Sequence, residues 1–379
     1  SPVVFLPGHG GNQLMWKIHL NPDSPDADCL SWNTEDWRRS WLNLWQVLRP
    51  GNIDCWSRLL LLEFNENTTR YSNHPGVRVK VPGWGKTHTI ERIDPSFAAW
   101  IFGDIGAYAF NSWGYSSGLN LFGAPYDFRY GPTSQPNNFN SRLKKLIENA
   151  HDQSSGEPVT LLAHSMGGIM AHYFLQSQSQ EWKDRYVRSL VTLSTPWRGS
   201  VAMVHAVLSG YAWGYDRESL LEPIRRTQRN AQSGFALFPS PGSWGKDEVL
   251  VQTAQRNYTA YEYEAMMNDI GFAQGFQMWN DSIYDMSHPG VKVNCYYGDK
   301  LPTPQTLVYG EGKFPDSQPE HVSADGDNTV LTRSLRGCED WKNTALGSKY
   351  PVTVEAFDYV THNQMIKDEK VLKYLEKII

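Results

Sequence analysis

The apolar positions of the chain fall into short, nearly continuous runs that alternate with helical patterns. The runs are rich in valine and leucine, and they occupy Val3–Pro7, Val159–Ala163, Val187–Ser194, Val291–Tyr297 and Val352–Phe357. Such runs, when helices separate them, are typical of parallel strands that are buried on both faces of a sheet. The pattern therefore predicts an α/β core with right-handed crossover connections.

Two helices are visible between these runs. One is predicted by the spacing i, i+4, i+7 and i+8 of four apolar residues, Phe139, Leu143, Leu146 and Ile147. The other follows Ser165 and extends to about Gln178. It directly succeeds the run that begins at Val159, so strand, turn and helix follow one another there.

Two regions do not show this alternation of apolar runs and helical patterns. The first, from Cys29 to about Pro82, is rich in tryptophan, and the second, from Gly199 to about Pro289, is long, polar and interrupted by glycine and serine. We interpret both as insertions above the carboxyl edge of the sheet, where open α/β sheets bind ligands.

The tryptophan-rich region contains a further helical pattern. Its large apolar residues recur at i, i+4, i+7, i+8 and i+11, in the order Trp37, Trp41, Leu44, Trp45 and Leu48. This spacing predicts one face of a helix that either packs on the core or enters a lipid surface or acyl groove. On the second interpretation, the candidate lipid-binding residues are Trp41, Leu44, Trp45 and Leu48.

The composition is that of a globular protein. The chain has 379 residues, of which 40% are hydrophobic and 20% charged, and its strictly apolar stretches are far shorter than the ~18 residues that span a bilayer. The formal net charge of −5, without a long basic run, argues against a nucleic-acid partner.

The four cysteines and three glycosylation sequons bear on the compartment. Four cysteines allow three pairings, and we expect the sequential one, Cys29–Cys55 with Cys295–Cys338. The alternative is four free thiols in a cytosolic protein. No C-x-x-C pair is present and no histidine lies at zinc-ligand spacing, so we expect no metal site. The sequons, at Asn67, Asn257 and Asn280, favour the secretory pathway.

The strongest chemical signal is the segment Ala163-His164-Ser165-Met166-Gly167. It matches the G-x-S-x-G nucleophile elbow, with alanine in place of the first glycine. A serine nucleophile needs a histidine base that a carboxylate orients, and hydrolases of this kind supply them in the order serine, acid, histidine. His362 follows the last predicted strand and is the expected base. Asp327 is the expected acid, with Asp325 as the competitor.

An acyl-transfer site also needs donors for an oxyanion. The main-chain N–H of Met166, the residue after the nucleophile, is one candidate. The other is the main-chain N–H of His9, because Gly8-His9-Gly10-Gly11 follows the first strand and is similar to the HGGG loop of esterases. A second glycine segment, Gly83–Thr87, looks like the end of a phosphate loop. Position 80 is lysine where that motif needs glycine, so nucleotide binding is rejected.

Together these motifs resemble the lecithin:cholesterol acyltransferase family, and within it the lysosomal phospholipase A2 branch. The resemblance covers nearly the whole chain. Its markers are PGHGGNQL, IDCW, VPGWGKT, GAPYDFR, AHSMG, STPWRG, DGDNTV and THNQM. It implies an α/β-hydrolase fold whose core comprises 1–28, 83–198 and 290–379, with a disulfide-closed, membrane-binding insertion at 29–82 and a cap at 199–289.

The resemblance also implies a function. It supports Ser165, Asp327 and His362 as a triad, His9 and Met166 as oxyanion donors, and both disulfides. Such enzymes use no metal or other cofactor. They cleave an acyl ester of a glycerophospholipid through an acyl-serine and pass the acyl group to water or to a lipid alcohol such as a ceramide. A secreted phosphatidylcholine–sterol acyltransferase is the alternative within the family, and a non-catalytic lipid-binding protein is the alternative outside it.

The expected partners and compartment follow from this resemblance. We expect a monomer that binds a phospholipid membrane surface peripherally and takes a lipid acyl donor and an alcohol acceptor. The expected compartment is the lysosomal lumen, with the extracellular space as the alternative. The chain departs from the family at His9-Gly10, where the lysosomal enzymes have Asp-Leu. We therefore hypothesise that His9 titrates near the site and changes the acidic pH optimum.

Overall fold

A central parallel sheet organises the chain. The computed structural model describes residues 1–379 apart from 48, 50, 95–98, 101 and 212–217. Six strands pair in the order β17-β14-β11-β10-β1-β9, and every pairing is parallel. Their bounds are β1 Val3–Leu6, β9 Leu121–Gly123, β10 Val159–His164, β11 Val187–Leu193, β14 Val293–Asp299 and β17 Val352–Asp358. All five predicted runs are strands of this sheet. β9 was not predicted, because three residues are too short to show a pattern.

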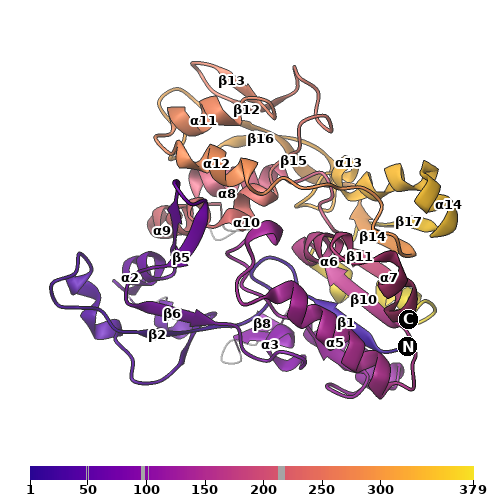
Figure 1. Cartoon of the computed structure of the whole chain (residues 1–379). Helices are drawn as coiled ribbons and strands as arrows, with labels where there is room; N and C mark the ends of the chain where they lie inside the picture. Colours follow the sequence, from indigo (N-terminus) through magenta and orange to yellow (C-terminus); the bar gives the residue numbers. More distant parts are fainter. Residues whose placement is uncertain (48, 50, 95–98, 101, 212–217) are drawn as a thin grey trace.

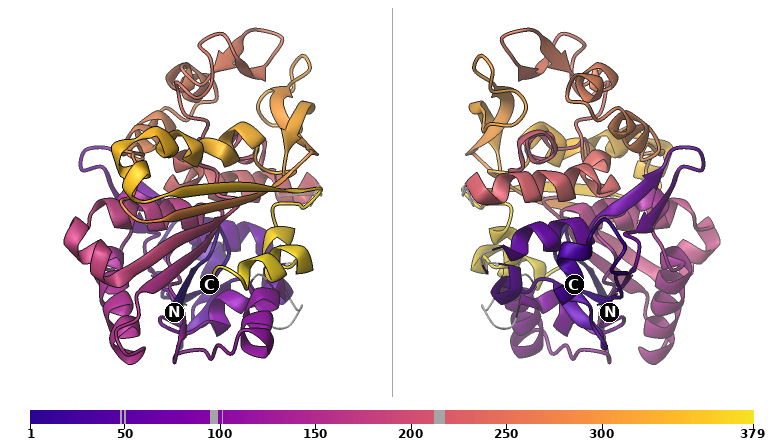
Figure 2. Two further views of the ribbon diagram at one scale, coloured as in Figure 1. Left: turned by 90° about the vertical axis from the view of Figure 1, so that its right-hand side faces the viewer. Right: turned by 90° about the vertical axis from the view of Figure 1, so that its left-hand side faces the viewer.

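Helices cover both faces of the sheet, and alternate residues of β1 show how (Figure 1, Figure 2). Val4 and Leu6 pack in one buried cluster with the predicted helix, which is α5 (Phe139–Gln153), and with α6 (Met166–Gln176). Val3 and Phe5 pack in a second cluster, with α4 (Gly103–Ser112) and α15 (Glu369–Leu375). Burial on both faces explains the continuous apolar runs of β1, β10, β11 and β14. The edge strand β17 differs, because its residues are half-buried or exposed.

The tryptophan-rich insertion forms a small unit beside the sheet. Strands β2 (Leu14–Ile18), β3 (Arg38–Trp41) and β6 (Val77–Lys80) make an antiparallel sheet in the order β3-β2-β6. The remaining elements are η1 Ala27–Trp32, α1 Leu44–Val47, α2 Asn52–Leu59, β4 Leu62–Asn65 and β5 Arg70–Asn73. The expected Cys29–Cys55 disulfide is present and joins η1 to α2. This unit has its own buried cluster, which includes Trp16, Trp32 and Trp56.

The helix predicted across Trp37–Leu48 is wrong. Arg38–Trp41 is a strand paired with β2, and only the four residues Leu44–Val47 are helical. The cause is tertiary pairing: the Ser40 carbonyl accepts a hydrogen bond from the Trp56 indole, and Trp41 stacks on that same indole. These contacts favour an extended β3, and the helical spacing of the tryptophans is coincidental. Leu48 lies outside the described residues.

The region expected to form the cap contains helices and two strands, and these strands join two later ones in a four-stranded sheet of order β13-β12-β15-β16. We refer to this assembly as the cap. Its elements are α8 Val201–Ser209, α9 Glu218–Arg229, α10 Gln232–Ala236, β12 Val249–Gln252, β13 Asn257–Thr259, α11 Tyr263–Asp269, α12 Gln274–Asn280, β15 Leu301–Val308 and β16 Glu320–Gly326. The strand pairing departs from the expected boundaries in two places. β15 and β16 follow β14 in sequence but pair with the cap strand β12, and β2, before residue 29, pairs with the strands of the insertion.

Short elements complete the chain: α3 His88–Glu91, β7 Arg92–Asp94, β8 Ala99–Trp100, η3 Pro132–Ser134, α7 Gln180–Tyr186, α13 Thr332–Leu335, η4 Arg336–Asn343, α14 Ala345–Lys349 and η5 Gln364–Ile366. The second expected disulfide, Cys295–Cys338, ties η4 to the central strand β14. Within the described ranges, no helix is long and apolar enough to cross a membrane.

Candidate active site

Ser165 occupies a sharp turn between β10 and α6. Its backbone has φ 54° and ψ −128°, a conformation that is strained for a residue with a side chain. The turn also brings backbones very close together. A Cβ added to Gly167 would lie 2.3 Å from the Leu6 carbonyl oxygen, and one added to Gly8 would lie 2.9 Å from the Ser165 Cβ. The small residues of the motif are therefore required by the elbow geometry.

The side chains of Ser165, His362 and Asp327 form a continuous hydrogen-bonded chain. His362 Nε2 lies 2.9 Å from Ser165 Oγ, and His362 Nδ1 lies 2.7 Å from Asp327 Oδ2. A carboxylate only accepts, so Nδ1–H donates to Asp327, which leaves Nε2 free to accept the serine proton. This tautomer is the one a general base requires.

Asp327 is held in place by the turn that carries it. It is fully buried, and its Oδ1 accepts the main-chain N–H groups of Thr329 at 3.0 Å and Val330 at 2.7 Å. Oδ2 is thereby directed toward His362. The competitor Asp325 is exposed on β16, two residues earlier, and is not part of this hydrogen-bonded chain.

The main chain of His362 is also fixed on both sides. Its N–H donates to the Asp327 carbonyl at 2.8 Å. Its carbonyl accepts a 2.9 Å hydrogen bond from Nε2 of His164, the residue before the nucleophile. Burial first, and then the neighbouring His362, lower the pKa of His164 to about 3. His164 is thus a neutral donor that connects the nucleophile elbow to the loop of the base, and sequence reasoning did not find this contact.

The glycine loop Gly8–Gly11 lies against the elbow and is held by three hydrogen bonds. Gly11 N–H donates to the Gly8 carbonyl at 3.0 Å, and the Tyr126 hydroxyl donates to the Pro7 carbonyl at 2.7 Å. The third comes from Trp41, whose indole N–H donates to the Gly10 carbonyl at 2.7 Å. Main-chain N–H groups in the first turn of a helix have no acceptor within that helix, so the N–H of Met166 at the start of α6 is available to a ligand.

The His9 side chain behaves differently from the sequence-based hypothesis. The residue as a whole is half-buried, but its Nδ1 is covered and has no hydrogen-bond partner among the described residues. The ring meets Phe128 edge-on. Burial lowers the pKa of His9 to about 4. The neutral imidazole is therefore favoured, and a titration near the ordinary value of ~6.5 is not expected.

Comparison of the amino-acid sequence with known families places this chain in one of them. The family model described as lecithin:cholesterol acyltransferase matches residues 37–286 and 277–370. The lysosomal phospholipase A and acyltransferase of Homo sapiens is 36% identical over 390 residues, covering 100% of this chain and 90% of the relative. The chain belongs to the lecithin:cholesterol acyltransferase family.

Other members of the family and a solved structure extend the comparison. The phosphatidylcholine-sterol acyltransferase of Gallus gallus is 35% identical over 373 residues, covering 96% of this chain and 87% of the relative. One chain in the crystal structure of the Tle4–Tli4 complex superposes with a TM-score of 0.55 at 14% identity, covering 100% of this chain and 98% of that one. This last likeness concerns the fold alone. The fold of this family member is the α/β-hydrolase fold, as predicted.

The three candidate lipid-binding residues that the structure describes differ in exposure, and the fourth, Leu48, lies outside the described residues. Trp41 is half-buried, stacked on Trp56 and edge-on to Phe128, and its N–H donates to the glycine loop. Leu44 is half-buried, whereas Trp45 is 65% exposed. The structure thus separates a half-buried tryptophan from an exposed tryptophan four residues later. The three sequon asparagines, Asn67, Asn257 and Asn280, are all exposed.

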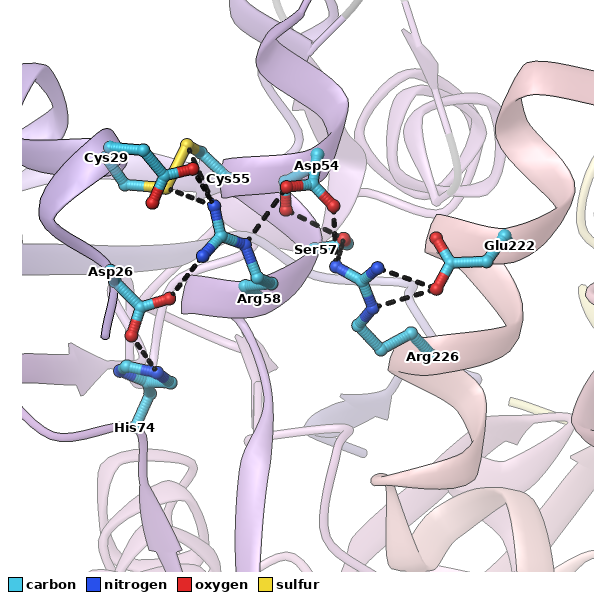
Figure 3. Close-up of polar contacts among 10 residues, drawn as sticks. Asp26, Cys29, Asp54, Cys55, Ser57, Arg58, His74, Glu222 and Arg226 are labelled. Carbon is cyan, nitrogen blue, oxygen red and sulfur yellow. Dashed lines mark hydrogen bonds and ion pairs between the residues drawn. A yellow bond between two sulfur atoms is a disulfide. The ribbon is translucent and has the colours of Figure 1, made fainter. Parts of the chain in front are cut away.

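A network of ion pairs joins the insertion to the cap (Figure 3). Arg58 on α2 contacts Asp26 at 2.7 Å, Asp54 at 3.0 Å and also Asp28. Asp54 in turn accepts a 2.8 Å hydrogen bond from Arg226 on the cap helix α9.

Asp28, Cys29 and Cys55 lie close enough together to suggest a metal site. The two sulfurs are bonded to each other, so they offer no thiolate ligand.

Proposed function

We propose that this family member is a serine-dependent lipid acyl hydrolase and acyltransferase that uses Ser165, His362 and Asp327. The observation that carries the proposal is the unbroken chain from Ser165 Oγ to His362 Nε2, and from His362 Nδ1 to Asp327 Oδ2, at 2.9 and 2.7 Å. The strained elbow that presents Ser165 supports the same role.

The first half-reaction forms an acyl-serine. Ser165 Oγ attacks the carbonyl carbon of an acyl ester while His362 Nε2 takes the hydroxyl proton. Asp327 stabilises the imidazolium that results. The main-chain N–H groups of His9 and Met166 donate to the oxygen that becomes negative in the tetrahedral intermediate. His362 then returns the proton to the departing lysolipid oxygen as the ester bond breaks.

The second half-reaction releases the acyl group. Water or a lipid alcohol enters, His362 removes its proton, and the new oxygen attacks the acyl-serine carbonyl. The ester bond to Ser165 breaks and its Oγ recovers the proton from His362. The identity of the second oxygen nucleophile alone distinguishes hydrolysis from transfer.

The names of the relatives support a glycerophospholipid as the acyl donor and leave two classes of acceptor. One relative is named as a phospholipase A and acyltransferase, which leaves its acyl acceptor open, and the other is named as a phosphatidylcholine-sterol acyltransferase, whose acceptor is a sterol. The resemblance to the lysosomal branch favours a ceramide-like alcohol as the acceptor. We propose that the protein acts as a monomer of the secretory pathway, in the lysosomal lumen, bound peripherally to a phospholipid membrane through the exposed Trp45.

One incubation tests these proposals. Vesicles that contain a phosphatidylcholine, a ceramide and a sterol are mixed with the protein, and the acylated products are identified by mass spectrometry. We expect lysophospholipid, free fatty acid and acylceramide, and none of these with Ser165→Ala. A predominance of sterol ester would assign the sterol acyltransferase activity instead. Product formation by Ser165→Ala would overturn the mechanism.

A further inference from the structure

A cavity of about 330 Å³ lies along α5, on the flank of the central sheet. Neither the triad nor the oxyanion loop lines it. Its wall combines the segment that follows β6 with one face of α5. Arg142, Lys145, Asn149 and Gln153 share that face, because they are three and four residues apart along the helix. The wall therefore contains two cationic heads and two amides from a single helix.

A third cation faces this helix from the opposite wall. Lys86 ends the Gly83–Lys86 segment, and its ammonium lies directly over Gly118: a Cβ added to that glycine would be 2.0 Å from Lys86 Nζ. No carboxylate lines the cavity. Across the described part of the chain, the charged heads of Lys86, Arg142 and Lys145 have no ion-pair partner, while seventeen ion pairs of lysine or arginine occur elsewhere.

Apolar side chains line the cavity beside these cations. The guanidinium of Arg142 lies 4.0 Å from the centre of the Trp84 ring, and Phe122 and Leu146 complete the wall. Arg142 is half-buried, and burial lowers the pKa of its guanidinium. Lys86 and Lys145 are exposed and Arg142 is half-buried, and no carboxylate in the cavity lining neutralises the three. The cavity therefore concentrates positive charge, which attracts an anion.

The main chain of the same segment excludes a nucleotide-type phosphate loop. Such a loop offers its backbone N–H groups to the phosphates. Here the N–H of Gly85 donates to the Gly123 carbonyl at 2.8 Å, that of Lys86 to Gly83 at 2.9 Å, and that of Thr87 to the Ser117 hydroxyl at 3.1 Å. An anion in this cavity is therefore bound by side chains alone.

We propose that this cavity binds a phosphate monoester. A dianionic phosphate matches three cationic heads, and the Asn149 and Gln153 amides can donate to its remaining oxygens. The volume is at the lower end of the range for small-molecule sites, which suits a glycerol phosphate-sized group. The group can belong to a soluble phosphate ester or to the headgroup of a phosphatidic acid, and both present the same chemistry.

Calorimetric titration with glycerol 3-phosphate tests the site directly. The Ser165→Ala protein is used throughout, so the result does not depend on the proposed catalytic function. We expect saturable binding that weakens by about tenfold or more in the double variant Arg142→Gln with Lys145→Gln, because charge-assisted hydrogen bonds are lost. The matched control, Lys370→Gln with Lys377→Gln, removes two exposed positive charges elsewhere and should bind as the parent does.

A second arm distinguishes the source of the phosphate. The same proteins are sedimented with phosphatidylcholine vesicles that contain either phosphatidic acid or phosphatidylserine. Preference for phosphatidic acid that the cavity variant loses assigns a lipid headgroup, whereas equal sedimentation together with glycerol 3-phosphate binding assigns a soluble ester. Arg142→Lys, which keeps the charge beside Trp84, should retain most of the affinity and serves as the folding control. Absence of saturable glycerol 3-phosphate binding, or binding that survives in the double variant, overturns the proposal.

Discussion

The indole N–H of Trp41 donates a 2.7 Å hydrogen bond to the main-chain carbonyl of Gly10. Gly10 has φ +68°, and a Cβ added to it would lie 3.1 Å from the Trp41 ring. Gly10 is adjacent to His9, whose main-chain N–H is a candidate oxyanion donor. A strand of the insertion therefore holds the loop that is expected to stabilise the transition state.

This contact predicts a catalytic defect in Trp41→Phe without a lipid-binding defect. Phenylalanine keeps an aromatic ring against Trp56 but lacks the N–H. We expect kcat on a soluble ester to fall by about tenfold, as for the loss of one hydrogen bond of ~1–1.5 kcal/mol, with vesicle binding unchanged. Trp45→Ala is the matched comparison. Its side chain is 65% exposed, so it should lose vesicle binding and keep the activity on the soluble ester. The reverse pattern would assign Trp41 to the lipid surface.

The two aspartates before His362 should differ sharply when each is replaced by asparagine. Asp327 is buried and bonded to His362 Nδ1, whereas Asp325 is exposed. Asp327→Asn removes the charge that stabilises the imidazolium, and it allows the wrong tautomer. We expect kcat to fall by about 10³–10⁴-fold. Asp325→Asn should stay within about twofold of the parent, because an exposed carboxylate outside the chain of hydrogen bonds does not act on His362. Equal losses in both variants would contradict the assignment of the acid.

The sequence predicts those parts of this molecule that are local. Val159–His164 and the elbow at Ser165 were found because strand, turn and helix follow one another within a few residues. Asp327 and His362 were proposed as acid and base from their order in the chain, and the structure alone reveals that their side chains meet. The contacts that fix the site are not local: His164 reaches the carbonyl of His362 across 198 residues. No periodic pattern records such a contact. The Trp37–Leu48 pattern failed for the opposite reason, because pairing with β2 overrode a local helical spacing.

Buried histidines should make the protein less stable in acid. Burial lowers the pKa of His164 to about 3, of His172 to about 4 and of His205 to about 3. Between about pH 6.5 and pH 4 the unfolded chain binds protons at these groups and the native state does not. The free energy of unfolding therefore falls as the pH falls through this window, by at most about 1.4 kcal/mol per pH unit for each group.

His205→Gln tests that linkage. His205 Nε2 donates to the Gln318 side-chain oxygen at 2.8 Å, and a glutamine amide can replace this donor. Urea unfolding between about pH 4.5 and pH 6.5 should show a shallower pH dependence in the variant, by up to one bound proton. Exposed His19→Gln is the control and should leave the slope as it is. An unchanged slope in His205→Gln would show that this histidine titrates normally in the folded protein.

The bridge between α2 and α9 should persist at acidic pH. The pKa of Asp54 is lowered chiefly by the hydrogen bond from Arg226, and further by the charges of Arg226 and Arg58 (Figure 3). A carboxylate of this kind stabilises the fold above its ordinary pKa of 3.8, and the effect is lost only as the pH falls through the lowered value. The Asp54 side chain is half exposed, so the bridge contributes less than about 1 kcal/mol.

Hydrogen exchange at about pH 5 and pH 7 measures the bridge directly, because it reports local opening of each helix. In the parent protein, α2 and α9 should show the same protection at both pH values once the intrinsic exchange rate is corrected. Arg226→Gln should raise exchange in both helices at both pH values, since Asp54 loses its partner across the junction while Arg58 remains bonded within the insertion. Lys370→Gln, which removes a charge far along the chain on α15, should change neither helix. Opening of the two helices in the parent at the lower pH alone would mean that Asp54 is protonated there, contrary to its depressed pKa.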